Sequence, residues 1–547
     1  MPAATTHPFA ITLDVGTSLT NETGSWRTRR PVYLDRLPPC NNTCPAGENI
    51  QAWLYLAEEG DYEGAWQEIL KNNPLPAVMG RACYHTCEVA CNRGAVDEAV
   101  GIHAVERFLG DEANKQGWMP KYETKSSGKK VLVIGAGPAG LSCAYHLTRM
   151  GHAVTVTDAS EKAGGMMRYG IPRYRLPSEA LDGDIRRIEK MGVNFQMNTY
   201  IEDMLKAKEE GGYDALFVAI GAQRPRGLDL PGAGQIPILK AIDVLRQMEV
   251  NADEGKPSVG SQTVVYGGGN VAMDVARSAV RLGAQVNVAV LENREQMPAH
   301  DFEVKEALEE GACLRGLRTI VQMEKGALAL EEMALDEQGK PQPTGRLESL
   351  EADTVVLAIG QEVETGLVEG IDEVSVRDGV VQIDEHMMTG HQGLFAGGDM
   401  VPSDRTMTTA IGHGKKAARH IDAWLCDETY VAPPKHELAA FENLNPWYYA
   451  DAPKTIQPVL TLIRRQSGFE EVLGNLDEAN ALYEARRCLS CGNCFECDTC
   501  YGICPDNAVN KLGPGKHFEF KYDYCKGCGL CVAECPCGSI EMVSEDI

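Results

Sequence analysis

The 547-residue sequence lacks any apolar run near the roughly 18 residues that a transmembrane helix needs, so no membrane span is expected. It is also short of positive charge. The 52 Lys and Arg stand against 78 Asp and Glu, and a net charge of −26 argues against nucleic acid or an anionic membrane as partner. The opening MPAATTHPFAITLD has no basic start followed by an apolar block, so no secretory signal is expected.

Cysteine is scarce through the middle of the chain and dense towards both ends. Of 19 cysteines, five lie in 40–91 and eleven in 488–537. Clustered cysteines in a large chain without an export signal indicate metal binding or redox chemistry rather than disulfides, and they predict a reducing, cytoplasmic location. The three isolated cysteines are Cys143, Cys313 and Cys426.

The middle of the chain alternates β-rich runs, glycine turns and amphipathic helices, which predicts a doubly wound α/β architecture. In the first unit the apolar run VLVI leads into Gly135, Gly137 and Gly140, and Asp158 ends the next predicted strand. Such glycines let a pyrophosphate approach a helix N-terminus, and the acidic residue accepts from ribose hydroxyls. The complete unit predicts dinucleotide binding, whereas a lone glycine turn is weaker evidence.

A second unit repeats this pattern. The run TVVY leads into Gly267, Gly268, Gly269 and Asn270, and Glu292 follows the next predicted strand. Two units in one chain predict two nucleotides, FAD in one and a nicotinamide cofactor in the other. This second unit contains no Cys-x-x-Cys, which disfavours a disulfide relay.

The C-terminal cysteines form two runs with the spacing C-x2-C-x2-C-x3-C-P of bacterial ferredoxins. In such runs the fourth cysteine ligates the other [4Fe–4S] cluster. Zinc is the alternative, because C-x2-C pairs bind zinc too. The predicted ligand sets are Cys494, Cys497, Cys500 and Cys535 for one cluster, and Cys525, Cys528, Cys531 and Cys504 for the other. Cys537 is left as a bystander.

Several motifs, GAGPAGL, GGMMRYGIPRYRLP, VAIGA, LAIGQ and GLFAGGDM, resemble those of flavoproteins with two dinucleotide-binding domains. The resemblance is strongest to the small subunit of glutamate synthase and the matching half of dihydropyrimidine dehydrogenase, and it covers roughly 40–430. It implies FAD on the first glycine loop, with Gly165 and Arg175 in the second motif among the cofactor-binding residues. It also implies that Gly398 and Asp399 contact the flavin side chain and that a helix N-terminus near Thr409 faces the flavin ring. The alternative for Asp399 is a loop residue that caps a helix.

The same resemblance implies two [4Fe–4S] clusters near the N-terminus, one with a non-cysteine ligand at Glu106. The family's cysteine pair upstream of Cys40 is missing, but EARRCLSCGN near the C-terminus looks like that pair relocated. The alternative is that the relocated pair are spare or regulatory thiols and one N-terminal cluster is missing, and that Glu106 is solvated or pairs with Arg107 or Arg93. The predicted sets are Cys40, Cys91, Cys488 and Cys491 for one cluster, and Cys44, Cys83, Cys87 and Glu106 for the other.

Members of this family that use NADPH carry two arginines where this chain has Leu291 and Glu292. Such arginines hold a 2′-phosphate, whereas a carboxylate bonds a free 2′-hydroxyl and repels phosphate. The sequence therefore predicts NAD(H), with Arg294 leaving NADP(H) open.

Together these features predict a multidomain α/β oxidoreductase: an α-helical Fe–S domain, two Rossmann-like domains and a C-terminal α+β ferredoxin-like domain with two [4Fe–4S] clusters. It would move electrons between NAD(H) and ferredoxin, or other Fe–S subunits of a complex such as a 2-oxoacid:acceptor oxidoreductase, through FAD and four clusters. No catalytic acid or base is required. The alternatives are an NADPH-dependent glutamate synthase small subunit and a non-catalytic electron-wire subunit. The expected divisions are 1–39 (arm), 40–120 (Fe–S), 128–225 and 361–430 (FAD), 226–360 (NAD(P)), 431–487 (linker) and 488–547 (ferredoxin).

Overall fold

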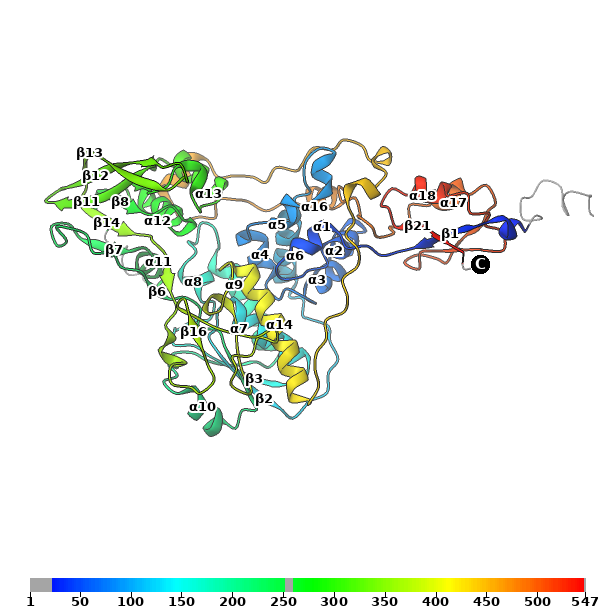
Figure 1. The fold of residues 1–547 in the computed structure, drawn as a ribbon, viewed down its shortest axis with the longest axis horizontal. Helices are drawn as coiled ribbons and strands as arrows, with labels where there is room; N and C mark the ends of the chain where they lie inside the picture. The colour runs from blue at the N-terminus through cyan, green and yellow to red at the C-terminus, as the bar shows by residue number, and fades with distance from the viewer. Residues whose placement is uncertain (1–21, 251–258, 546–547) are drawn as a thin grey trace, which may run out of the picture.

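The computed structural model describes residues 22–250 and 259–545 and arranges them in four bodies (Figure 1). A helical domain lies at the centre. In Figure 1 one domain built on a parallel sheet lies to its left and a second lies below it, and a small C-terminal module, defined here as residues 488–545, extends to the right.

The helical domain forms because its apolar residues recur at three- and four-residue spacing and meet in one core. Trp53 and Trp66 are fully buried there. Asn49 and Asp61 cap the second and third helices by accepting backbone N–H bonds. The helices are α1 (Pro39–Thr43), α2 (Ile50–Glu58), α3 (Tyr62–Ile69), α4 (Pro76–Ala82), α5 (Thr86–Val89) and α6 (Ile102–Gln116).

The first sheet domain is a five-stranded parallel sheet in the order β18-β5-β2-β3-β4. Its last strand and helix come from a later part of the chain, after the second sheet domain. The central strands are buried on both faces, which explains their continuous apolar runs. The elements are β2 (Lys130–Ile134), α7 (Pro138–Arg149), β3 (Ala153–Thr157), α9 (Ser178–Lys190), β4 (Asn194–Gln196), β5 (Ala215–Val218), β18 (Leu394–Ala396) and α14 (Met407–Leu425).

The second sheet domain is a parallel sheet in the order β10-β9-β8-β14-β7, joined to a three-stranded antiparallel sheet. The Rossmann-like architecture that the two glycine units predicted is therefore present twice. The elements are β7 (Ile238–Lys240), α11 (Ala241–Val250), β8 (Gln262–Tyr266), α12 (Asn270–Arg281), β9 (Gln285–Ala289), α13 (Asp301–Glu309), β10 (Cys313–Arg315), β11 (Arg318–Glu324), β12 (Ala327–Leu335), β13 (Pro341–Glu351) and β14 (Thr354–Leu357).

The segment 431–487, expected to be a linker, also contributes to two of the domains. Its helix α15 (Leu462–Ser467) contacts α12, and α16 (Glu478–Ala485) packs on α2 and α6. Leu476, Ala481 and Ala485 are buried in the core of the helical domain. The proline-rich composition of the segment gave no sign of α16. This short helix packs on the helical domain and places the chain there immediately before Cys488.

Part of the N-terminal arm packs against the C-terminal module. Strand β1 (Arg29–Tyr33) pairs antiparallel with β21 (Ile540–Ser544), and the two lie side by side in Figure 1. The described part of the N-terminal arm therefore covers the module. Residues 1–21 lie outside the described residues. The other elements are α17 (Thr499–Ile503), β19 (Val509–Lys511), β20 (Phe518–Phe520) and α18 (Leu530–Ala533).

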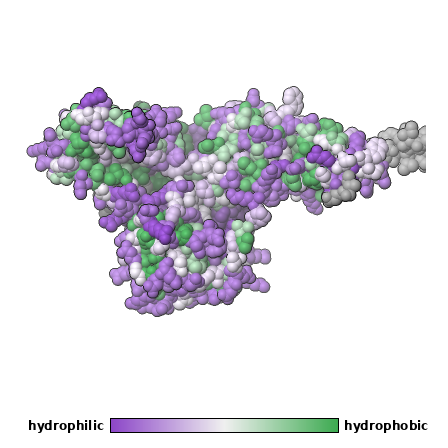
Figure 2. Space-filling model, in the orientation of Figure 1, coloured by the Kyte–Doolittle hydropathy of each residue, from purple (hydrophilic) through white to green (hydrophobic). Residues whose placement is uncertain are grey.

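Hydrophilic residues cover most of the face shown in Figure 2, with hydrophobic residues in scattered groups. Among the helices of the described residues, none combines the length and apolar character needed to span a bilayer.

Candidate functional site: a dinucleotide cavity beside clustered thiols

The first glycine loop connects β2 to α7 at the carboxyl edge of the first sheet. Gly135 has φ +108°, and a Cβ there would lie 2.4 Å from the carbonyl oxygen of Ala219. A Cβ on Gly140 would lie 1.9 Å from the carbonyl oxygen of Gly135. Gly137 immediately precedes α7 as its N-cap. The loop therefore excludes side chains and leaves the helix N-terminus open to a phosphate.

Asp158 follows β3 and faces the same loop. Its carboxylate accepts the backbone N–H of Ala136 at 2.8 Å and of Ser160 at 2.7 Å. These two bonds fix the carboxylate beside the glycine loop, where the sequence predicted contact with a ribose.

Two adjoining cavities, of about 400 and 190 Å³, share part of their lining and run from the glycine loop to the N-terminus of α14. An elongated space of this kind suits an extended dinucleotide. The predicted cofactor-binding residues that line it are Gly135, Gly137, Asp158, Gly165, Arg175, Asn270, Gly398 and Asp399.

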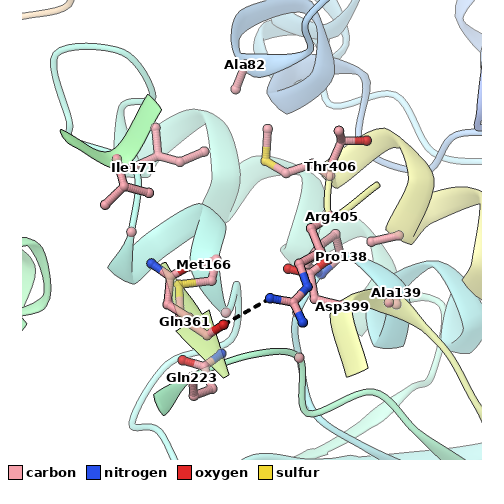
Figure 3. A pocket seen from close by; sticks show the side chains of 18 of the residues that line it. Ala82, Pro138, Ala139, Met166, Ile171, Gln223, Gln361, Asp399, Arg405 and Thr406 are labelled. Atoms are coloured by element: carbon pink, nitrogen blue, oxygen red, sulfur yellow. Dashed lines mark hydrogen bonds between the residues drawn. The ribbon is translucent and has the colours of Figure 1, made fainter. Parts of the chain in front are cut away.

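The inner end of this cavity is lined by residues from distant parts of the chain, among them Ala82, Gln361 and Thr406 (Figure 3). Thr406 caps α14 by accepting the N–H of Thr409 at 3.1 Å. Thr406 lines the cavity, whereas Thr409, the residue expected near the flavin ring, is not among the lining residues. Because Thr406 is this cap, Asp399 does not cap α14. Burial raises the pKa of Asp399, with Arg405 opposing. The Arg405 guanidinium donates to the carbonyl oxygen of Gln361 at 3.0 Å.

The second glycine loop repeats the close packing of the first. A Cβ on Gly267 would lie 2.3 Å from the carbonyl oxygen of Ala358, and Gly269 is the N-cap of α12. The Glu292 carboxylate oxygen would lie 3.5 Å from a Cβ at Gly268. Glu292 therefore reaches the loop, as a ribose-binding carboxylate must.

Arg294, the residue that left NADP(H) open, donates to the Asp301 carboxylate at 2.6 Å. The Asp301 carboxylate therefore partly neutralises the positive charge of Arg294 within the second sheet domain.

Tyr84 was not predicted from the sequence. The one sequence feature that could have pointed to it is its position between Cys83 and Cys87. It belongs to the helical domain yet lines the inner cavity. The Asn270 amide donates to its hydroxyl at 2.9 Å, and its ring stacks on His300 with centroids 4.0 Å apart. Tyr84 thus joins the helical domain to the second glycine loop.

Arg175 lies where the two sheet domains meet. Its guanidinium donates to both carboxylate oxygens of Asp274, at 2.9 and 2.8 Å, and forms an ion pair of 2.5 Å with Glu303. Both carboxylates belong to the second sheet domain, and neither was predicted. Arg175 therefore holds the domains together while it lines the cavity.

The first thiol set surrounds one small cavity lined by Cys40, Cys91, Cys488 and Cys491. Burial raises the pKa of the Cys40 thiol, and the thiols of Cys488, Cys91 and Cys491 raise it further. The structure thus brings together cysteines from the two ends of the chain. Four converging thiols suit an iron–sulfur cubane.

The second thiol set contains Cys44, Cys83 and Cys87, with a carboxylate beside it. Burial raises the pKa of Cys87, and Cys83 and Cys44 are among the neighbours that add to it. Burial also raises the pKa of Cys83 to about 11, with Glu106 as one contributor.

Glu106 is 6% exposed, so it is not a solvated residue of a helix face. The amide of Asn73 donates to it at 2.8 Å and to Glu48 at 2.9 Å. Arg107 and Arg93 pair with other carboxylates, Glu471 and Asp97 respectively.

Burial and the neighbouring Glu48 hold the pKa of Glu106 well above its usual range. A buried carboxylate in this position suits a metal ligand, because a bound cation offsets its charge. Glu48 was not predicted.

The second thiol set adjoins the inner end of the dinucleotide cavity. The Cys83 sulfur lies 3.1 Å from the hydroxyl of Thr408, in the first turn of α14. Ala82 and Tyr84, on either side of Cys83, line the cavity itself. A thiol of the second set is therefore in direct hydrogen-bonding contact with the first turn of α14.

The C-terminal module brings its two cysteine runs together crosswise. One cavity is lined by Cys504 from the first run and by Cys525, Cys528 and Cys531 from the second. In the other set, burial raises the pKa of Cys494, and Cys500, Cys535 and Cys497 raise it further. Cys537, expected to be a bystander, has its sulfur 3.8 Å from that of Cys535.

One further group of possible metal ligands lies beside the thiols: His85, Glu88 and His103, whose ligand atoms lie within 4.8 Å of one another. Glu88 already accepts from the ammonium of Lys454 at 2.7 Å and from His103 at 2.6 Å. Since a cationic side chain occupies this carboxylate, the group needs no metal ion.

Two parallel-sheet domains with glycine loops, beside clustered thiols, define a pyridine-nucleotide oxidoreductase of the iron–sulfur type. The chain belongs to the pyridine nucleotide-disulphide oxidoreductase family, whose model matches residues 129–415. The model described as dihydropyrimidine dehydrogenase domain II, 4Fe-4S cluster, matches residues 17–118. FAD, NAD(P) and [4Fe–4S] binding are thereby supported, and the resemblance stated from the motifs is confirmed.

Three curated relatives show the range of this family. The chain is 35% identical to the NADP(+)-dependent formate dehydrogenase subunit beta of Moorella thermoacetica over 83% of this chain and 70% of that one. It is 34% identical to the NADPH glutamate synthase small chain of Escherichia coli, over 71% of this chain and 89% of the other. It is 32% identical to the NAD-dependent dihydropyrimidine dehydrogenase subunit PreT of Escherichia coli, over 71% and 91%.

Proposed function

We propose that this chain passes electrons between NAD(H) and a ferredoxin or a partner oxidoreductase, through FAD and four [4Fe–4S] clusters. The observation that carries the proposal is the contact of Cys83 with Thr408, because it joins a thiol set to the flavin end of the dinucleotide cavity. A bound flavin supplies the exchange between two-electron hydride chemistry and one-electron transfer.

The protein's own residues bind and orient in this scheme. Asp158 would hold the ribose beside the first glycine loop, and Asp399 with the N-terminus of α14 would hold the flavin end. Ala82 and Tyr84 separate that end from the thiols behind it. No side chain need accept or donate a proton, because the nicotinamide and the flavin carry the hydride chemistry themselves.

The cluster ligands follow from the four sets of converging side chains. Four cubanes predict about 16 iron and 16 sulfide per chain, whereas two ferredoxin-type clusters alone predict about eight of each. Iron and acid-labile sulfide are measured on anaerobically purified protein, and a value near eight contradicts the N-terminal assignments. The proposed ligands are Cys40, Cys91, Cys488 and Cys491; Cys44, Cys83, Cys87 and Glu106; Cys494, Cys497, Cys500 and Cys535; and Cys504, Cys525, Cys528 and Cys531.

NADH is the proposed nucleotide, although relatives that use NADP(H) exist. Support comes from the Glu292 carboxylate beside the second glycine loop and from the pairing of Arg294 with Asp301. Glu292→Arg is expected to lower the preference for NADH over NADPH at least tenfold, about 1.4 kcal/mol, because it replaces a repelling carboxylate with a phosphate-binding guanidinium. Flavin bleaching by each nucleotide gives the ratio, and an unchanged ratio contradicts this assignment.

Electrons would leave through the C-terminal module, where Cys497 and Cys528 are exposed. The partner is then a ferredoxin or a subunit of a larger complex, such as a 2-oxoacid:acceptor oxidoreductase. The alternatives are a glutamate synthase small subunit and an electron wire without nucleotide activity. NADH bleaching of bound yellow flavin separates the enzyme from the wire, and co-purification from the native host identifies the partner.

A further inference from the structure

The N-terminal arm crosses the C-terminal module and completes its fold. All five residues of β1 pair with β21, and Tyr33 stands opposite Ile540 at the end of the register. Upstream, the Thr23 hydroxyl donates to the carbonyl oxygen of Tyr524. Downstream, Arg36 pairs with Glu541 at 2.7 Å. The described part of the arm is thus held at both ends and in the middle.

Tyr33 is the arm residue that reaches the thiols. Its ring stacks on Phe520 with centroids 4.6 Å apart and planes 15° from parallel. Its hydroxyl lies 3.2 Å from the sulfur of Cys500. The stacked ring fixes the direction of the hydroxyl, so this contact is a built feature of the packing.

A phenol is protonated at neutral pH, with an ordinary pKa of about 10, and a ligating thiolate can only accept. The hydroxyl therefore donates to the Cys500 sulfur. Such a bond strengthens as negative charge on the sulfur increases. Cluster reduction adds one electron, with no covalent bond formed or broken and no proton transferred, so the hydrogen bond favours the reduced state.

We propose that Tyr33 is a positioning residue that raises the reduction potential of the cluster ligated by Cys500, relative to the same cluster without this hydrogen bond. The inference rests on the cluster assignment proposed above. It gives the N-terminal arm a role in electron transfer: the arm makes this cluster a better electron acceptor. Within the module, the backbone of Tyr501 also hydrogen-bonds to Cys500, and the Tyr33 hydroxyl is a further donor that comes from the arm.

The test is Tyr33→Phe, which keeps the stacked ring and removes the hydroxyl. We expect the reduced-to-oxidised ratio of one cluster at fixed potential to fall about tenfold, which is 59 mV for a one-electron couple. The matched control is Tyr522→Phe, which removes a phenol hydroxyl that donates to the carbonyl oxygen of Pro31 at 2.9 Å, on the same arm. That control should leave the ratio unchanged. Potentials are measured by redox titration followed by electron paramagnetic resonance.

A second variant acts in the opposite direction without removing any contact. A fluorinated tyrosine at position 33 keeps the ring and makes the hydroxyl a stronger donor, so the potential should rise. If neither variant shifts a potential while wild type contains about 16 iron, the inference is overturned and the proposed function stands. If the wild-type protein lacks the module clusters, both this inference and the proposed function are wrong.

Discussion

The two cysteine-rich regions of this chain are built in opposite ways. In the C-terminal module, all eight proposed ligands lie within 494–535 and the spacing alone arranges them. In the N-terminal region, Cys40 and Cys91 meet Cys488 and Cys491, which come from the other end of the chain. A local pattern can specify a site by itself, whereas a site shared between distant segments depends on the packing that delivers them. The helix α16, which packs on α2 and α6, brings Cys488 and Cys491 to this site.

The largest expected effect comes from removing the distant pair. Cys488→Ser with Cys491→Ser should remove about four iron and interrupt transfer from flavin to the module, while NADH still bleaches the flavin. Metal analysis and reduction of an external ferredoxin measure both. The matched control is Cys313→Ser with Cys426→Ser, two exposed isolated cysteines. Unchanged iron in the first variant would show that the pair are spare thiols.

Removing the carboxylate tests the second N-terminal set. Glu106→Ala should release or weaken one cluster, lowering iron by up to about four atoms, because three thiols remain without a fourth ligand. Glu106→Cys should restore it. The control Glu48→Gln keeps the hydrogen-bonding shape beside Asn73. If the Ala variant keeps its full iron and an unchanged spectrum, Glu106 is not a ligand.

A smaller effect is expected from the anchor of α16. Leu476 is 5% exposed in the core of the helical domain, so Leu476→Ala should cost about 2–4 kcal/mol of unfolding free energy. Leu512→Ala, at an exposed position in the module, should cost less than about 0.5 kcal/mol. Thermal unfolding compares the two. Equal effects would mean that α16 does not anchor the C-terminal segment.

The smallest expected effect concerns Tyr84, which joins the helical domain to the second glycine loop. Tyr84→Phe removes the hydrogen bond from Asn270 but keeps the stacking on His300. The loss of one such bond costs about 1 kcal/mol, so the KM for NADH should rise no more than a few fold. Tyr145→Phe removes a buried hydroxyl bond far from the loop, to the carbonyl oxygen of Leu70, and serves as the control. A larger effect on KM in the control would contradict the role of Tyr84.

Much of the fold could be predicted because its evidence is local. The runs VLVI and TVVY, each followed by a glycine turn, predicted two parallel-sheet domains, and both are present. Tyr84, Glu48 and the partners of Arg175 could not be predicted, because their positions depend on contacts between domains. The helix α16 was not predicted from the sequence for a related reason. It is short, and its stability comes from burial against α2 and α6 rather than from its own sequence.

The sequence by itself determined the class of the protein, because the glycine units and the ferredoxin spacing are short motifs, and each specifies local geometry within a few residues. Only the tertiary structure decided where the electron-carrying parts meet. It brought Cys83 to the first turn of α14 and Tyr33 to Cys500. The physical reason is that these contacts join segments hundreds of residues apart, and their geometry is set by the packing of whole domains.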